Sequence, residues 1–272
     1  MNNISLGQYY PANSILHRLD PRMKLVCAFL YIVSTFLCKN ILSFAALILL
    51  AAILVVISKI PIRMILRSFK PILFILLFTA VINIFWTSGE TLLFEWRFIH
   101  IYLEGVMTAI FMAVRIFSLI IGTTLFLTYT TTPIALTDAI EQLFAPLKKI
   151  KLPVHEFAMM MTIALRFIPT LVDETDKIMS AQKARGADFT SGGLVKRAKA
   201  LIPILIPLFV SAFRRADELA TAMECRCYRG GDGRTRMTVL HYHAYDFVFL
   251  ILLILFAALF VLLGKLGIGY TM

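Results

Sequence analysis

The acidic residues with the most suggestive spacing for catalysis lie together in one predicted helix. Asp173 and Asp176, with Glu174 between them, place carboxylates three residues apart, where they could hold Mg²⁺ against a diphosphate. An enzyme of that kind normally needs a second acidic motif facing the first, and none is evident. The simpler interpretation is a solvated helix face balanced by Lys177 and Lys183.

Neither the cysteine and histidine pairs nor the glycine-rich run completes a binding motif. Cys225-x-Cys227 and His241-x-His243 supply four possible zinc ligands, but neither pair has the usual gap of two to four residues. The run Gly230–Arg234 is typical of a helix stop and a turn rather than of an anion nest. The chain also lacks the phosphate loop that would let it bind ATP by itself. The sequence therefore predicts no metal site and no catalytic residue.

Two arginines are harder to explain by local structure. The stretch 153–231 predicts two amphipathic helical arms, which end in Ala184-Arg185-Gly186 and in Cys225-Arg226-Cys227. A cation at a helix C-terminus contributes only about 0.3–1 kcal/mol, which does not explain why both arms repeat an Arg between small residues. Small neighbours allow a helix end to enter a narrow groove, where the planar guanidinium can bind a carboxylate or backbone carbonyls. The pattern predicts two docking tips.

The arms that carry these arginines have apolar residues at helical spacing, and Pro169, Pro203 and Pro207 predict kinks in them. The apolar run 201–213 is too short, at about 13 residues, to cross a membrane core of about 30 Å. It is expected along the interface or under a partner. A shorter helix is predicted from Pro133 to Phe144, with Thr132 as its N-cap.

The rest of the chain predicts a membrane anchor. Its hydrophobic content of 60% and mean hydropathy of +0.84 indicate an all-α integral membrane protein, and the net charge of +11 is better explained by membrane topology than by nucleic acid. About five transmembrane helices are predicted, at 23–38, 41–57, 71–86, 105–129 and 247–263. The predicted domains are 1–129 with four spans, the cytoplasmic domain of long amphipathic helices 130–245, and 246–272 with the last span.

Lysines and arginines set the predicted orientation, because loops rich in them remain in the cytoplasm. This places the N-terminus, the connector 58–70 and the segment 130–245 inside, and the acidic loop after Trp86 and the C-terminus outside. Arg115 interrupts the fourth span. We favour a structural role for it, as a snorkelling side chain or an ion pair with Glu104 or a partner subunit, over a role in transport.

Three separated motifs resemble one known family. They are the opening run from Gly7 to Leu25, the sequence Ala184-Arg185-Gly186, and the run from Glu224 to Arg236. Together they resemble the T components (EcfT) of energy-coupling factor (ECF) transporters, the membrane scaffolds of prokaryotic ATP-driven importers for vitamins and trace metals. Cys225 and Cys227 stand where the second motif usually has Ala and Gly. Either the backbone turns at Cys227, or the helix continues to Gly230.

The resemblance implies a non-catalytic coupling subunit in the plasma membrane of a prokaryote. Both tips, Ala184-Arg185-Gly186 and Cys225-Arg226-Cys227, would dock on two ABC-type ATPase subunits, EcfA and EcfA′. These partners would use ATP and Mg²⁺, and this chain would bind no cofactor. A substrate-binding membrane subunit, the S component, would contact the apolar faces of the arms at Met160, Met161, Ala164, Leu205, Leu208 and Ala212. The adaptable methionines would suit several interchangeable S components.

Two alternatives remain open. A conventional ABC permease would carry substrate through its own pore, which requires a polar pathway, yet Asn83 and Arg115 are nearly the only polar residues in the predicted spans. A membrane enzyme acting on lipid diphosphates would use Asp173 and Asp176. The leading prediction is the coupling subunit.

Overall fold

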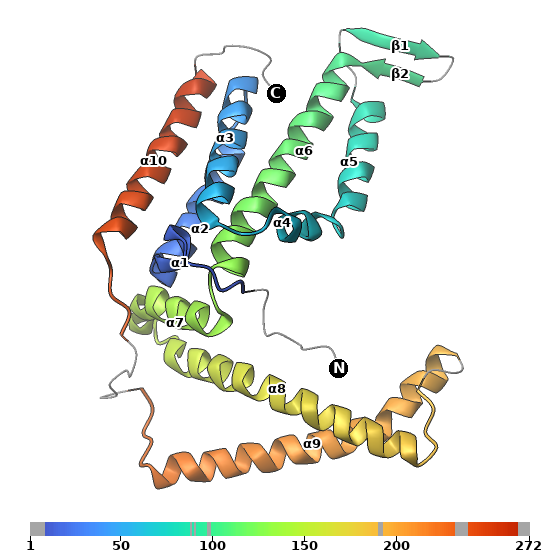
Figure 1. The fold of residues 1–272 in the computed structure, drawn as a ribbon, viewed down its shortest axis with the longest axis vertical. Coiled ribbons are helices and arrows are strands. Elements are labelled where there is room, and N and C mark those ends of the chain that lie inside the picture. Colours follow the sequence, from blue (N-terminus) through green and yellow to red (C-terminus); the bar gives the residue numbers. More distant parts are fainter. Residues whose placement is uncertain are drawn as a thin grey trace. The chain divides into compact units, whose positions relative to one another are not determined.

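The computed structural model describes residues 9–87, 89, 91–96, 99–189, 193–231 and 239–265. This part of the chain is helical apart from one β-hairpin. Its main elements are α1 (Ile15–Arg18), α2 (Pro21–Leu37), α3 (Ile41–Ser58), α4 (Ile62–Phe69), α5 (Leu73–Trp86), β1 (Leu92–Trp96), β2 (Ile99–Tyr102), α6 (Leu103–Thr123), α7 (Pro133–Phe144), α8 (Val154–Ala184), α9 (Leu194–Cys225) and α10 (Ala244–Lys265). Two compact units result: a membrane unit, Gly7–Ala139 with Val239–Met272, and an arm unit containing Ile140–Thr238 (Figure 1).

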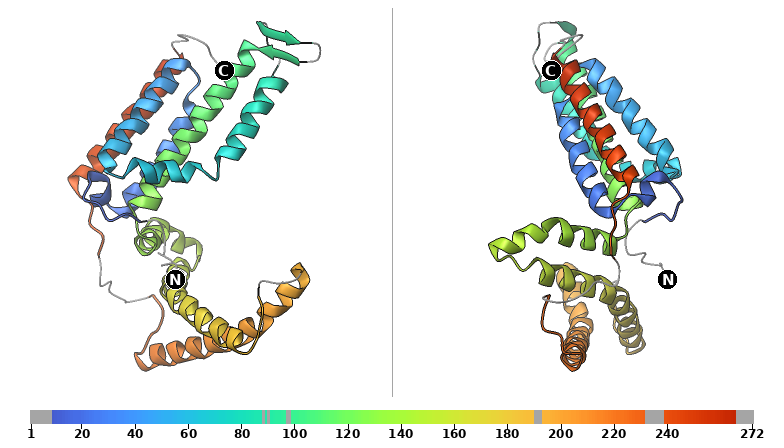
Figure 2. Two further views of the ribbon diagram at one scale, coloured as in Figure 1. Left: turned by 45° about the vertical axis from the view of Figure 1, so that its right-hand side comes forward. Right: turned by 90° about the vertical axis from the view of Figure 1, so that its left-hand side faces the viewer.

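In the membrane unit α10 packs on α2 and α3, these two helices pack on α6, and α5 packs on the other side of α6 (Figures 1 and 2). Among the described residues, three helices are long and apolar enough to span a membrane: α3, α10, and α6 with the π-helical segment Thr124–Tyr129 that extends it. The pair α4 and α5, bent by 58° at its break, brings the number to as many as four. Helix α2 has 17 residues, slightly fewer than the usual ~20 for a span.

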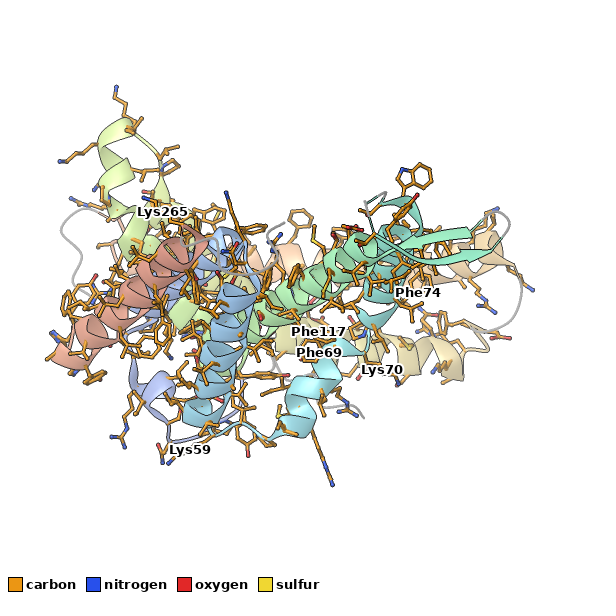
Figure 3. The ribbon with its side chains drawn as sticks, turned by 90° about the horizontal axis from the view of Figure 1, so that it is seen from above. Lys59, Phe69, Lys70, Phe74, Phe117 and Lys265 are labelled. Carbon is orange, nitrogen blue, oxygen red and sulfur yellow. The ribbon has the colours of Figure 1, made fainter. Side chains whose placement is uncertain are left out.

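Two elements of this unit were not predicted. The connector 58–70 contains α4, whose Phe69 ring meets Phe117 of α6 with 4.7 Å between centroids (Figure 3). The loop after Trp86 contains an antiparallel hairpin that pairs β1 with β2. On α5, Phe74 is 77% exposed, as expected for a side chain that faces lipid or a partner.

The core of the membrane unit lies mainly between α2, α3, α6 and α10, and one of its close contacts joins α2 to α6. Tyr31 is fully buried and its hydroxyl donates to the Ser118 carbonyl at 3.0 Å. Gly122 makes this approach possible, because a Cβ there would overlap the Tyr31 ring. These contacts hold the middle of α2 close to the last turns of α6.

Arg115 has a structural role at the end of α2. Its Nη2 donates to the backbone carbonyl of Cys38 at 3.0 Å, and Cys38 is the C-cap of α2. Glu104, expected as its partner, accepts from the backbone and hydroxyl of Thr91. It lies about 16 Å away along the helix, so the expectation of an ion pair with Glu104 is wrong. A helix-end carbonyl, otherwise an orphan acceptor, is the group that this arginine satisfies.

The arm unit consists mainly of two long helices, α8 with 31 residues and α9 with 32. They cross and pack on each other (Figures 1 and 2), and Arg215 of α9 donates to Glu174 of α8 at 2.9 Å near the crossing. Both helices continue through their prolines. Helix α7 begins as predicted, with the Thr132 hydroxyl accepting from the Ala135 amide.

Candidate functional site

The first arm ends in a turn that only glycine adopts easily. Helix α8 ends at Ala184, Arg185 is its C-cap, and Gly186 has φ +87°. The Gly186 amide donates to the Lys183 carbonyl and the Ala187 amide to the Gln182 carbonyl, both at 3.0 Å. This pair of bonds is a Schellman motif, in which the residue after the C-cap is left-handed.

The second arm ends in the same way with a different residue. Helix α9 ends at Cys225, Arg226 is its C-cap, and Cys227 has φ +54°. The Cys227 amide donates to the Glu224 carbonyl at 2.8 Å, and the Tyr228 amide to the Met223 carbonyl at 3.0 Å. These bonds correspond one for one to those of the first arm. The backbone therefore turns at Cys227, and the helix does not continue to Gly230.

Both ends present an arginine to solvent between two small residues. We call Ala184-Arg185-Gly186 the first tip and Cys225-Arg226-Cys227 the second tip, and all six residues are exposed. Each guanidinium extends from the position where its helix backbone stops. Because the last carbonyls of a helix carry partial negative charge, a cation is favoured there in the free protein. Its fork of donors remains available to a carboxylate or to backbone carbonyls of a partner.

A contact that sequence reasoning missed lies just beyond the second tip. Gly231 lies against the imidazole of His155 in the first turn of α8, and a Cβ on Gly231 would come within 2.5 Å of the His155 Cδ2. The Nδ1 of His155 is 2.8 Å from a carboxylate oxygen of Glu141 in α7, which orients the ring. We call this arrangement the His155–Gly231 contact. It joins the end of the second arm to the start of the first.

The residues expected to contact an S component lie on α8 and α9. Met160, Met161, Ala164 and Leu205 are exposed, whereas Leu208 and Ala212 are half-buried. Further large apolar side chains of α9 are exposed nearby in the sequence: Ile202, Ile206, Phe209, Val210 and Phe213. Exposed apolar surface of this extent is typical of a membrane or protein interface.

The groups considered for catalysis are not assembled into a site. Asp173 and Asp176 are exposed, and Glu174 is occupied by Arg215. Across the described ranges, no three His, Cys, Asp or Glu side chains lie close enough to hold a metal, and Cys225 and Cys227 are free thiols. The part of the glycine-rich run from 232 onward lies outside the described residues.

The membrane unit gives equally little support to a polar pathway. Asn83 donates to the Thr79 carbonyl of its own helix at 2.9 Å, and Arg115 binds the end of α2. Both polar side chains on which a pore would depend are thus engaged in helix structure.

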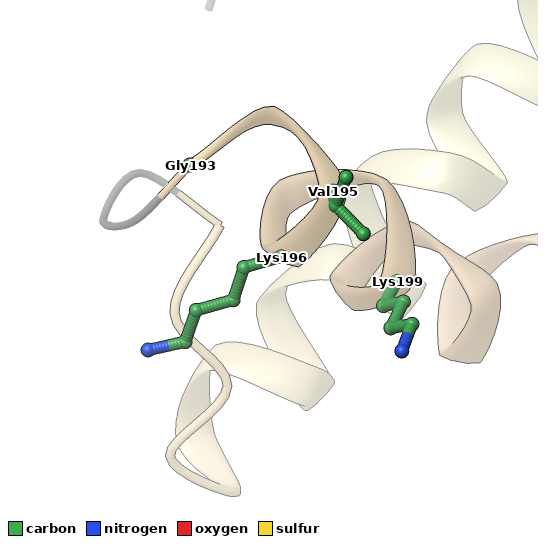
Figure 4. Close-up of a pocket in the computed structure, with 4 residues that line it drawn as sticks. All are labelled: Gly193, Val195, Lys196 and Lys199. Atoms are coloured by element: carbon green, nitrogen blue, oxygen red, sulfur yellow. The ribbon is translucent and has the colours of Figure 1, made fainter.

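A shallow hollow of about 540 Å³ lies at the start of α9, lined by Gly193, Val195, Lys196 and Lys199 (Figure 4). Its two lysine side chains are exposed. The hollow is open and basic, and it does not enclose a ligand in the way that cofactor pockets do.

Comparison with known proteins decides between these interpretations. The family model described as cobalt transport protein (CbiQ) matches residues 12–239. The energy-coupling factor transporter transmembrane protein EcfT of Ruminiclostridium cellulolyticum is 59% identical over 246 residues, which are 90% of this chain and 91% of the relative. The EcfT proteins of Acidaminococcus fermentans and Bacillus subtilis are 52% and 49% identical, over 99% and 95% of this chain and 98% and 97% of those proteins. The chain belongs to the EcfT family.

Membership of the EcfT family confirms three predictions. The chain is an integral membrane protein of helices, it crosses the membrane more than once, and it is a transmembrane component of an ECF transporter rather than an enzyme. The alternative of a lipid-diphosphate enzyme is therefore set aside.

Proposed function

We propose that the two tips dock on two ABC-type ATPase subunits, EcfA and EcfA′, and that the arms pass ATP-driven motion to a substrate-binding S component for a vitamin or a metal ion. The observation that carries this proposal is the match between the tips. Two crossing helices end in the same Schellman motif, each with an exposed Arg at its C-cap. One repeated end suits two related partners, because each groove would recognise the same backbone turn and the same guanidinium.

The arms are long enough to act as levers. At 31 and 32 residues they are about 46–48 Å long, and the half-buried Arg215–Glu174 pair links them at 2.9 Å. Displacement of one tip would therefore also displace the point at which the two helices are in contact. ATP and Mg²⁺ act in the partner subunits, and this chain supplies the mechanical connection.

The S component is expected on the apolar surface of α8 and α9. Met160 and Met161 on α8 and Leu205 on α9 are exposed, with exposed fractions of 58%, 41% and 46%. Methionine side chains adapt to differently shaped partners, so this surface suits exchange between several S components.

Charge within the membrane unit supports the proposed orientation in a prokaryotic plasma membrane. The cations of the connector and of α4 lie at the end of the unit where α6 finishes, because the Tyr129 hydroxyl there donates to the Met64 carbonyl of α4. The β-hairpin lies at the opposite end of α6 (Figure 1). Basic residues favour the cytoplasmic side, and this supports an orientation with the N-terminus and the arms inside and the C-terminus outside.

Reversing both tip charges tests the proposal. In the double variant Arg185→Glu/Arg226→Glu, we expect loss of ATPase co-purification and of substrate uptake, while the protein still inserts in the membrane. The matched control is Arg197→Glu, which reverses an exposed arginine of α9 outside both tips and should leave both measurements unchanged. Normal co-purification and uptake in the double variant would show that the tips are not the docking sites.

A further inference from the structure

The first turn of α2 buries an unusual number of charges. Asp20 is its N-cap, with Pro21 at the first helical position, an arrangement that favours a helix start. Asp20 and Lys24 are only 5% and 2% exposed, and Arg22 is half-buried. Burying charges is costly unless they are paired and hydrogen-bonded. The hydrogen-bond partners of these side chains therefore identify the segments of the chain that this turn fixes in place.

Asp246 caps two helices at once. It is fully buried in the first turn of α10. One carboxylate oxygen accepts from the His243 amide at 2.8 Å, and the other accepts from the Asp20 amide at 3.1 Å. A single negative charge thus satisfies orphan amides at the starts of both α10 and α2, where the helix dipoles favour it.

Arg22 holds the segment through which the chain returns from the arm unit. Its Nε and Nη2 donate to the Asp20 carboxylate at 3.0 and 2.9 Å, and Nη2 also donates to the Leu240 carbonyl at 3.0 Å. The guanidinium carbon lies 3.8 Å from the centre of the Tyr242 ring. Since the membrane unit resumes at Val239, the returning chain is fastened to α2 within its first four residues.

Lys24 holds the segment through which the chain leaves. Its ammonium donates to the Thr130 carbonyl at 2.7 Å and to the His17 carbonyl at 3.2 Å. Thr130 follows the last turn of the α6 segment and precedes α7, within which the chain passes into the arm unit between Ala139 and Ile140. The departing chain is therefore fastened to the same turn of α2.

We infer that Asp20, Arg22, Lys24 and Asp246 form an anchor through which displacement of the arms reaches the membrane helices. This inference rests on the proposed function, because it presupposes that ATPases move the arms. Between residues 9 and 265, the chain passes from one unit to the other at 139–140 and at 238–239, and both of these connections are held by the first turn of α2. A pull on either connection is delivered to α2, and through Asp246 to α10. These four are positioning residues, distinct from the tips and from the exposed apolar surface.

The test measures coupling in the assembled transporter, reconstituted with both ATPases and an S component. Asp246→Asn is nearly isosteric, but it turns one of the two acceptor oxygens into a donor that faces a backbone amide. We expect the ATPases to co-purify and to hydrolyse ATP normally, while substrate uptake per ATP falls about tenfold, the factor that corresponds to loss of one charge-assisted hydrogen bond.

Tyr242→Ala gives a milder second variant. Tyr242 is 47% exposed, so its removal does not open the core. It takes away the ring beneath Arg22 and should reduce uptake per ATP about twofold, because an exposed cation–π contact is worth less than a buried hydrogen bond. This variant keeps the test decisive if Asp246→Asn fails to insert.

The matched control lies at the other end of α10. Asn40 is fully buried and its amide donates to the Leu263 carbonyl at 3.1 Å, but no connection to the arm unit passes there. Asn40→Ala should lower the melting temperature while leaving uptake per ATP unchanged. Equal uncoupling by Asn40→Ala, or unchanged coupling in both Asp246→Asn and Tyr242→Ala, would overturn the anchor. Failure of the unmodified chain to bind ATPases would instead overturn the proposed function.

Discussion

The two tips share a backbone and differ in the residue that makes its turn. In the first, the left-handed position is occupied by Gly186, with φ +87°; in the second, by Cys227, with φ +54°. A left-handed conformation costs an ordinary L-residue about 1–2 kcal/mol and costs glycine almost nothing. The second tip nevertheless makes both hydrogen bonds of the motif. The two tips therefore share one backbone geometry. Its conformational free-energy cost is higher in the second tip, where cysteine takes the left-handed position, than in the first, where glycine does.

The tips also differ in the contacts of the chain just beyond them. After the second tip, Gly231 packs on His155, a contact that restrains the chain five residues after Arg226. At the first tip, no heavy atom lies within 4 Å of the place where a Gly186 Cβ would stand. The second tip thus combines a strained turn with a contact that restrains the chain after it, whereas the first has a glycine turn with open space at the Cβ position.

The largest expected effect comes from breaking that support. Gly231→Ala would place a methyl group within 2.5 Å of the His155 Cδ2, and Glu141 restrains the ring from moving away. We expect a local destabilisation of about 1–3 kcal/mol, as for overpacking of a close contact. Hydrogen exchange of the peptide that covers 224–231 measures it, as faster exchange.

A double-mutant cycle with His155→Ala makes this prediction specific. In that background the added methyl group meets no ring, so Gly231→Ala should cost little, and a coupling energy of about 1 kcal/mol or more should appear. Gly193→Ala is the control, because a Cβ at Gly193 has open space and its φ is −70°. Additive effects of the Gly231 and His155 changes would show that the contact does not support the tip.

Most helices of both units could be predicted from the sequence, because their patterns are local. Apolar runs marked α3, α5, α6 and α10, and helical spacing marked both arms. The missed helix α4 had a usable signal, since Ile62, Ile65, Leu66 and Phe69 recur at the spacing i, i+3, i+4, i+7. The four cations of the connector are typical of a loop at the membrane surface, so no helix was predicted there. The hairpin 92–102 is rich in aromatic and β-branched residues, which also favour strands.

The tips could be located from sequence, but their support and the anchor could not. Small residues around Arg185 and Arg226 mark the tips in a local pattern. Whether α9 turned at Cys227 depended on backbone hydrogen bonds that composition does not specify. The amide of Asp20 and the carboxylate of Asp246 are 226 residues apart in the chain, and neither residue type is unusual at a helix start. Partners at such separations are set by tertiary packing.

A smaller effect is expected where the turn depends on glycine alone. Gly186→Ala meets no neighbouring atom, so its cost is that of the left-handed backbone, about 1 kcal/mol. That corresponds to about fivefold faster exchange of the amides at positions 186 and 187, which make the two bonds of the motif. Exchange in the second tip should not change. An unchanged rate at the first tip would show that the turn is not under backbone strain in the variant.

The smallest effect has the opposite sign. Cys227→Gly removes the conformational cost at φ +54° but also gives the unfolded chain more freedom, so the net gain should be below about 1 kcal/mol. Exchange of the amides at positions 227 and 228 should slow by up to about fivefold. Cys225→Ala is the control, because Cys225 is the last residue of α9 and a change between small residues there should alter stability by a few tenths of a kcal/mol. Faster exchange in Cys227→Gly would mean that the cysteine side chain itself stabilises the second tip, and the equivalence of the two turns would then hold for their backbone alone.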